Sequence, residues 1–429
     1  MAGQLLLLDS IDRNHLIVVT VNEKRQVLKE TFPFGIRSEA VKPFSAVWLS
    51  HLLVEIFLLM HPALVPVFRK EFTLTIFQAG LLITIPSLCR LAIVLPTGIF
   101  ADKYGSRPFI VLSLLVSGLS ALLLSQSTEM LVLLISLSLI MISVTLYHPP
   151  GMSVIGKLFP NQSERSAAIG LHGASGCIGQ SVGTISLGLL LAQYGWRYCY
   201  LLFSIPLLTW AVLLARMKIP QLSKSPRPRT DESELKNDAA APQPKRALVT
   251  PRFSLLLLSM GLNALATGGA AAFMTTYLTS TQNLPLETAS VIFGAGPLIG
   301  IAGSLAAGYI GTKLGDRNAL TAFYFAEAVF LLGLITIPFT PLAALSFLMY
   351  QLFSAAIWTP STSMVASLMG RTGGGTAYSL FYFAGDALGA VSPLIAAILI
   401  ESLGLVSPFM FAVVLLLSSA LLVRVIRES

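Results

Sequence analysis

The amino-acid sequence contains an internal repeat with an offset of 210 positions. The stretch GIFADKYGSRP at 98–108 recurs as GYIGTKLGDRN at 308–318, and Pro150 recurs as Pro360. Glycines and basic residues match between the stretches: Gly98, Lys103, Gly105 and Arg107 align with Gly308, Lys313, Gly315 and Arg317. An offset shared by a loop, a helix breaker and the flanking apolar runs indicates a duplicated structural unit.

Long apolar runs dominate both copies. Of all residues, 55% are hydrophobic and 11% are charged, whereas soluble domains carry about 25% charged residues. A helix needs about 20 apolar residues to cross a bilayer. Twelve runs reach this length: 44–67, 76–100, 108–126, 130–149, 165–192, 196–216, 252–280, 286–311, 319–338, 341–368, 374–400 and 404–424. The sequence therefore predicts an all-α polytopic membrane protein with two pseudo-symmetric six-helix bundles, and it excludes an outer-membrane barrel.

The distribution of charge separates a membrane protein from a nucleic-acid-binding one. The formal net charge is +8, and with both termini inside, 24 of the 28 Lys and Arg residues fall in cytoplasmic segments. Such a bias sets the orientation of membrane proteins. We therefore expect both termini inside, a location in the cytoplasmic (inner) membrane, and the lipid bilayer rather than nucleic acid as a partner.

The sequence divides into four segments. Residues 1–42 are expected to form a cytoplasmic N-terminal extension, either short strands around a turn or residues added from an upstream start codon. Residues 43–217 and 251–429 are expected to form the two bundles. Residues 218–250, rich in Pro, Ser and charge, predict a flexible cytoplasmic linker with one short helix near 231–236. The three cysteines lie in apolar runs and predict neither a disulfide nor a metal cluster.

The repeated loop carries a functional signature. GIFADKYGSRP resembles the loop between helices 2 and 3 of the major facilitator superfamily, which in that family latches the two halves together on the cytoplasmic side. The resemblance implies a gating loop made of Gly98, Asp102, Lys103, Gly105, Arg107, Gly308, Lys313, Gly315 and Arg317. Because the second copy has Thr312 where Asp102 stands, the charged latch is expected on one side only. A loop that merely follows the charge bias is the alternative, which explains Lys103 and Arg107 but neither the carboxylate nor the glycine spacing.

Two further stretches resemble one subgroup of that superfamily. SHLLVEIFLLMHPALVPVF at 50–68 is similar to the first helix of fosmidomycin-resistance-type exporters, and 147–183 is similar to their helix 4 to helix 5 segment. Five glycines of the latter segment resemble the glycine-rich fifth helix of drug:proton antiporters, with helix packing alone as the alternative. The resemblance implies export of a small solute in exchange for protons and does not identify the cargo.

Ionisable residues inside membrane helices indicate function because burying them in lipid is costly. Glu55 and Arg90 are both expected near the middle of the bilayer on neighbouring helices, where an ion pair is geometrically feasible. Such a pair is either structural or handles protons or cargo. His51 lies one helical turn from Glu55, so we predict Glu55 as the proton-coupling acid, tuned by His51. Asp386, in the eleventh helix, is predicted as a second protonation or binding residue.

Further polar residues are expected to line a central cavity. The predicted cavity residues are Arg90, Tyr147, His148, His172, Gln180, Asn263, Tyr378 and Tyr382. For each of them, an interhelical hydrogen bond is the alternative to a cargo contact. His172 and Tyr382 occupy equivalent positions in the two copies, which favours a shared central site. Glu327 is expected to be a packing or interfacial residue in a peripheral helix, and the isolated histidines predict no metal site.

Together these features predict a proton-coupled secondary transporter that works by alternating access. Export of a drug-like, toxic or anionic compound is the leading direction. Import of a small organic anion by proton symport is one alternative, and a non-transporting sensor or scaffold with a transporter fold is another. The sequence holds no catalytic motif, so we expect no enzymatic activity and no cofactor. The expected partners are a small-molecule substrate and protons, and the expected state is a monomer.

Overall fold

The computed structural model describes residues 38–159, 162–217, 219, 250–338 and 340–426, with side chains except at 38, 102, 162–163 and 369–379. Every regular element in this part of the chain is a helix. The strands predicted near the N-terminus and the short helix predicted near 231–236 fall outside the described residues. The side chains of Asp102 and Tyr378 do so as well, and their predicted roles stay predictions.

Twelve membrane crossings follow from these helices. The helices of the first copy are α2 (Ser38–Glu55), α3 (Met60–Ala63), α4 (Val65–Glu71), α5 (Ile76–Tyr104), α6 (Ser106–Ser125), α7 (Met130–Leu158) and α8 (Gln162–Arg216). The helices of the second copy are α10 (Pro251–Ser280), α11 (Leu286–Leu314), α12 (Asp316–Thr336), α13 (Thr340–Ala356), α14 (Trp358–Leu403) and α15 (Ser407–Val425). Eleven helical segments are long and apolar enough to cross a membrane. The one within α8 is broken at Gly195 (φ 76°, ψ 167°) and holds two crossings, which confirms the predicted count.

The backbone repeats as the sequence does. Four glycines among the described residues have a positive φ, a conformation that glycine adopts without steric cost. Gly105 and Gly315, with φ of 92° and 79°, end α5 and α11. Gly195 and Gly404, with φ of 76° and 90°, kink α8 and end α14. The same sharp turns therefore occur at matching places in both copies, which supports two bundles built from one duplicated unit.

The first membrane crossing is broken, whereas the sequence predicted one helix over 44–67. α2 ends at Glu55, and turn residues separate it from α3. Pro62 has no N–H, and its ring clashes with the carbonyl group four residues earlier. In the turn before Pro62, Leu58 N donates at 3.1 Å to Glu55 O, three residues earlier. In an α-helix the same N–H would donate to the carbonyl group four residues earlier. Glu55 therefore lies at a helix break inside the membrane, a common setting for transporter sites.

Close backbone contact between α2 and α8 fixes the position of Glu55. A Cβ atom added at Gly179 would overlap the carbonyl oxygen of Leu52 on α2. Small residues permit this approach because no side chain separates the two helices. At Gly170, nearer the start of α8, a Cβ atom would have no neighbour within 4 Å. Of the five glycines at 170–183, only those from Gly176 onward therefore form a packing surface for α2.

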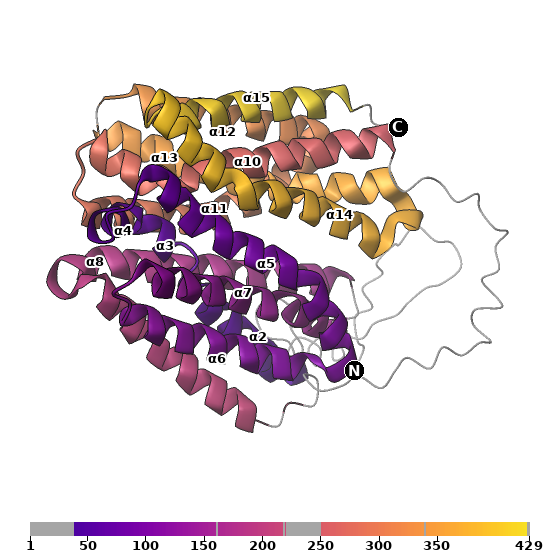
Figure 1. Ribbon diagram of the computed structural model, residues 1–429. Coiled ribbons are helices and arrows are strands. Elements are labelled where there is room, and N and C mark those ends of the chain that lie inside the picture. Colours follow the sequence, from indigo (N-terminus) through magenta and orange to yellow (C-terminus); the bar gives the residue numbers. More distant parts are fainter. Residues whose placement is uncertain (1–37, 160–161, 218, 220–249, 339, 427–429) are drawn as a thin grey trace, which may run out of the picture.

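The two bundles contact each other at the predicted outer ends of their helices. Gly188 of α8 lies against Glu287 of α11, and Gly80 of α5 lies against Ala397 of α14. An apolar cluster from both bundles continues this contact: Val65, Ala79, Ile83, Ala272, Phe273, Ala396, Ala397 and Ile400. Figure 1 shows the bundles converging near α3 and α4 and diverging toward the opposite end. The helices of the two bundles therefore lie farther apart at the predicted cytoplasmic end than at the outer end.

Candidate proton and cargo sites

Three helices of the first bundle place polar side chains around Glu55, which is 2% exposed. Glu55 Oε2 accepts a hydrogen bond of 2.8 Å from Gln180 Nε2 of α8. Glu55 Oε1 lies 3.3 Å from His148 Nε2 of α7 and 3.8 Å from His51 Nε2, one turn earlier on α2. The two Nε2 atoms are 3.3 Å apart. We call His51, Glu55 and His148 the acceptor cluster, because their three atoms converge on one point.

Backbone carbonyl groups fix which nitrogen of each imidazole carries hydrogen. His51 Nδ1 lies 2.8 Å from the carbonyl oxygen of His172, and His148 Nδ1 lies 2.7 Å from that of Val144. Because a carbonyl oxygen only accepts, both Nδ1 atoms donate, and Nε2 of a neutral ring then carries a lone pair. With Glu55 ionised, three lone-pair atoms would face one another. The acceptor cluster therefore needs one added positive species, and a proton is the smallest that fits.

His172 and Tyr147 support His51 from inside the bundle. The rings of His51 and His172 stack with centroids 3.9 Å apart. His172 Nε2 donates to the Tyr147 hydroxyl at 2.9 Å, and that hydroxyl donates to the Val47 carbonyl at 2.6 Å. Both Tyr147 and His172 are buried. In this conformation these two predicted cavity residues therefore act as interhelical hydrogen bonders, which was the alternative interpretation.

The ion pair between Arg90 and Glu55 that the sequence made feasible is not formed in this conformation. Arg90 Nη2 lies 3.6 Å from Asp386 Oδ1, which joins α5 of the first bundle to α14 of the second. α5 packs against both α7 and α14, and the Arg90 side chain extends from it toward α14, whereas Glu55 turns toward α7 and α8. The Arg90 and Asp386 side chains are 35% and 46% exposed. Arg90 lies ten residues beyond Gly80, about 15 Å along α5 toward the predicted cytoplasmic side.

Aromatic side chains lie beside Asp386. Tyr382 is one helical turn before Asp386 on α14, and its ring centroid is 5.3 Å from that of Trp358. Trp358 and Tyr382 are 47% and 42% exposed, and we call this pair the aromatic surface. Sequence reasoning missed Trp358. The repeat offset was the signal that would have found it, because Trp358 aligns with His148.

The second bundle has a buried polar pair of its own. Asn263 Nδ2 of α10 donates to Glu327 Oε2 of α12 at 3.2 Å, and Glu327 is fully buried. Asn263 was predicted in the cavity, and in this conformation it bonds inside the bundle. Glu327 was expected in a peripheral helix, yet its carboxyl group lies in the interior. The sequence has no histidine after His172, so this carboxyl group has no imidazole counterpart of the acceptor cluster.

The basic loops bond within their own bundles. Arg107 Nη2 donates to the carbonyl groups of Leu214 and Ala215 at 3.2 and 2.7 Å. Arg317 Nη1 donates to the carbonyl group of Ile426 at 3.3 Å. The last carbonyl groups of a helix lack partners within it, so each arginine caps the sixth crossing of its own copy. The same kind of contact thus occurs in both copies, and each of these contacts lies within one bundle.

The other residues of the predicted gating loop are little constrained by neighbours here. The ammonium groups of Lys103 and Lys313 lie 5.3 and 5.8 Å from the centroids of adjacent tyrosine rings. A Cβ atom at Gly98 would have one neighbour at 3.9 Å, and one at Gly308 would have none within 4 Å. A latch that closes the cytoplasmic side would be disengaged in a conformation open on that side. The gating role of these residues stays a prediction.

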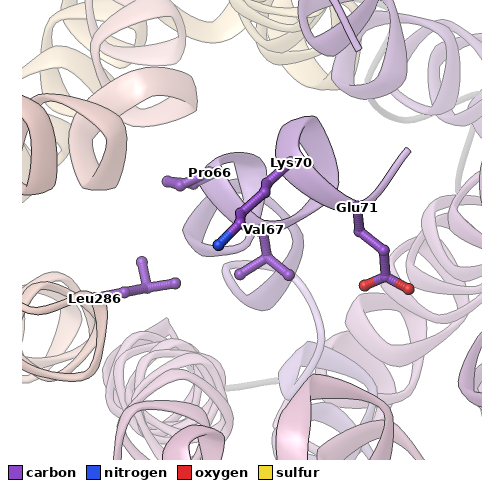
Figure 2. Close-up of a pocket in the computed structure, with 5 residues that line it drawn as sticks. All are labelled: Pro66, Val67, Lys70, Glu71 and Leu286. Carbon is purple, nitrogen blue, oxygen red and sulfur yellow. The ribbon is translucent and has the colours of Figure 1, made fainter. Parts of the chain in front are cut away.

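A separate pocket lies at the predicted outer face. It has a volume of about 610 Å³ and is lined by Pro66, Val67, Lys70 and Glu71 of α4 and by Leu286 of α11. Figure 2 shows Lys70 and Glu71 projecting to different sides of the short helix. Glu71 Oε2 accepts a hydrogen bond of 2.8 Å from the Trp196 indole. None of the lining residues belongs to the acceptor cluster or the aromatic surface, so the pocket is distinct from the central groups.

Twelve helical crossings in two like bundles, joined at one end and apart at the other, define a membrane transporter fold with ionisable groups at its centre. The Major Facilitator Superfamily model matches residues 47–393. The chain belongs to this family. It is therefore a multi-pass integral membrane protein of a transporter family that acts on small molecules, and not an enzyme.

Individual relatives are more distant. The chain is 25% identical over 299 residues to the fosmidomycin resistance protein of Escherichia coli (strain K12), over 67% of this chain and 69% of that protein. It is 22% identical over 361 residues to the hexuronate transporter of Bacillus subtilis (strain 168), over 79% and 83% of the two chains. A bacterial homologue of the human lysosomal transporter Spinster, in an inward-facing and occupied conformation, has a similar fold. The TM-score is 0.71 at 15% identity, over 90% of this chain and 96% of that one.

Proposed function

We propose that this protein exports a small toxic or anionic compound in exchange for protons, by alternating access in the cytoplasmic membrane. The observation that carries the proposal is the acceptor cluster of His51, Glu55 and His148. Its three lone-pair atoms lie within 3.8 Å of one another and require one added positive species. In the same proposal the chain acts as a monomer, with bundles at 43–217 and 251–429 joined by a cytoplasmic linker.

The proton would enter and leave through His148. Its side chain is 39% exposed, whereas those of His51 and Glu55 are 7% and 3% exposed. Gln180 donates a hydrogen bond to Glu55 Oε2, which keeps Oε1 oriented toward the two imidazoles. Rocking of the bundles would expose the acceptor cluster to each side in turn, because this cluster belongs wholly to one bundle. A proton bound from outside would then be released inside, and cargo would move the opposite way.

One observation favours export as the direction. A relative is named a resistance protein, which is a name for a protein that protects its host from a compound. A proton gradient directed inward supplies the free energy for such an exchange, since protons move down their gradient as cargo moves out.

The test compares two matched carboxyl substitutions. Glu55→Gln removes the titratable group of the acceptor cluster, and Glu327→Gln makes the same change at a buried, carboxamide-bonded glutamate of the other bundle. In everted vesicles, addition of fosmidomycin, or of another compound to which the wild type gives resistance, should partly collapse an imposed pH gradient. We expect Glu55→Gln to abolish this collapse while inserting normally, and Glu327→Gln to retain it. Normal collapse with Glu55→Gln would refute the proton-coupling role.

Import of a small organic anion by proton symport is the second candidate. The observation that favours it is the half-exposed Arg90 at the junction of the bundles, together with the similarity to a hexuronate transporter. An arginine attracts a carboxylate, and a proton carried in the same direction would offset its charge. Uptake driven by an inward pH gradient in right-side-out vesicles, without accumulation in acid-inside everted vesicles, would select this candidate over export.

A further inference from the structure

We infer that Arg90, Asp386 and the aromatic surface of Trp358 and Tyr382 form the cargo site, and that it takes an organic anion with a planar apolar body. The anionic group of the cargo replaces the Asp386 carboxylate as the partner of Arg90. The inference rests on the proposed transport function and names its substrate class. It does not depend on the direction of transport or on proton coupling at Glu55.

The contact between Arg90 and Asp386 is long and accessible enough for an anion to replace Asp386. The 3.6 Å between Nη2 and Oδ1 exceeds the 2.7–2.9 Å of a charge-assisted hydrogen bond by roughly 0.7 Å. Both side chains are partly exposed, and they come from different bundles. A guanidinium group offers donors in a planar fork that matches carboxylate, sulfonate or phosphonate oxygens bidentately. A small anion that reaches Arg90 therefore gains a geometry that Asp386 does not supply.

The neighbouring carboxylate sets the strength of anion binding. An anion on Arg90 lies close to Asp386 and is repelled by it, since two like charges within a few ångströms in a partly dry site disfavour each other. Removing the charge of Asp386 therefore strengthens anion binding, whereas removing that of Arg90 weakens it. The opposite signs of these two effects distinguish a cargo site from a purely structural ion pair, in which either substitution would only destabilise the protein.

The aromatic surface supplies the apolar half of the site. Tyr382 lies one turn from Asp386 on the same face of α14, and Trp358 packs beside Tyr382. Nearly half of each residue is exposed, so both rings have surface left for a ligand. Flat aromatic faces bind planar or apolar bodies through stacking and area burial. A cation beside such a surface favours an amphipathic anion over a fully hydrated one.

The test uses a matched pair of probes with the purified full-length protein. Benzenesulfonate is a permanent anion with a planar ring, and benzenesulfonamide is its neutral counterpart. Binding is measured by equilibrium dialysis for the wild type, Arg90→Gln, Asp386→Asn and Trp358→Ala. We expect Arg90→Gln to weaken benzenesulfonate binding about ten- to hundredfold, the range for a lost charge-assisted hydrogen bond. Asp386→Asn should strengthen it, Trp358→Ala should weaken both probes, and benzenesulfonamide should not respond to the charge substitutions.

Controls separate loss of the site from loss of the fold. The double variant Arg90→Gln/Asp386→Asn leaves no unpaired charge, and it should stay folded and still bind benzenesulfonate weakly. Glu327→Gln, which alters neither the acceptor cluster nor the cargo site, should bind benzenesulfonate as the wild type does. Loss of proton coupling appears in the pH-gradient assay and loss of the cargo site appears in dialysis, so the two failures give different results. The inference is overturned if neither the wild type nor Asp386→Asn binds benzenesulfonate. It is also overturned if Asp386→Asn and Arg90→Gln weaken binding alike, or if Arg90→Gln binds normally.

Discussion

The two bundles share one backbone plan but carry different chemistry at equivalent positions. His148 of the first copy aligns with Trp358 of the second, and His172 aligns with Tyr382. His172 is 3% exposed and helps to hold a buried carboxylate and two imidazoles, whereas Tyr382 is 42% exposed beside Trp358. The difference indicates that the two copies diverged in chemistry after the duplication. On our account these residues of the first bundle exchange protons, and those of the second supply the aromatic surface for a cargo whose anionic group binds Arg90 of the first bundle.

A single glycine position shows how the divergence was achieved. In the first bundle Gly176 leaves room for the imidazole of His51, because a Cβ atom there would lie 2.6 Å from His51 Cε1. The aligned residue of the second bundle is Asp386, whose side chain reaches Arg90 across the junction. Gly176 thus allows His51 to pack closely in the first bundle, whereas Asp386, at the same place in the repeat, connects the second bundle to the first.

The largest expected effect comes from the packing that positions Glu55. In Gly179→Val the new side chain would meet the Leu52 backbone, so α2 and α8 must move apart, at a cost of about 3 kcal/mol or more. Thermal unfolding in detergent measures the loss. Gly170→Val is the matched control, since that site has room, and it should unfold as the wild type does. Equal stability of the two variants would show that backbone contact does not set the acceptor cluster.

A smaller effect is expected from the histidine that differs between the bundles. His148→Gln removes one acceptor of the cluster, and we expect proton-driven transport to fall about tenfold or more. The control is His61→Gln, because His61 is also buried in the first bundle but bonds to the Phe57 carbonyl group. The pH-gradient assay in everted vesicles compares them. If both variants lose the same activity, the effect is structural and the assignment of protons to the cluster fails.

The smallest effect concerns the outer ends, where the two bundles meet. Glu401 of α14 accepts a hydrogen bond of 2.9 Å from Phe77 N at the start of α5, where a helix dipole favours a carboxylate. Burial lowers the pKa of the nearby Arg69, and Glu401 opposes that shift. Glu401→Gln should shift the conformational equilibrium toward the outward-open state about two- to fivefold. Spin labels on the outer ends of α5 and α14 report it, and an unchanged distance distribution would exclude a role for this contact.

The fold could be predicted from the sequence because its signals are local and repeated. Apolar runs of sufficient length gave the crossings, and the offset of the loop glycines gave the duplication. The break after Glu55 was not predicted, although Pro62 was visible, because prolines in membrane helices are often accommodated by neighbouring groups. Its effect depends on whether α3 and α4 find other contacts, which a single sequence does not specify.

The site was predicted only where partners lie on one helix. His51 and Glu55 are one turn apart, so their proximity followed from helical geometry. The partner of Arg90 was left open by the sequence, because the rotation of α5 about its own axis decides whether Arg90 faces Glu55 or Asp386. Such rotations are set by packing between helices distant in sequence, and no local pattern records them.

The central claim is that the acceptor cluster holds one exchangeable proton between the Nε2 atoms of His51 and His148 and Glu55. Nitrogen NMR of ¹⁵N-histidine-labelled protein in lipid tests it directly, since the chain has five histidines. We predict that His51 and His148 carry hydrogen on Nδ1 and share one further proton at Nε2, and that Glu55→Gln perturbs these signals while leaving those of His61 unchanged. Separate neutral rings with hydrogen on Nε2, unaffected by Glu55→Gln, would contradict the account.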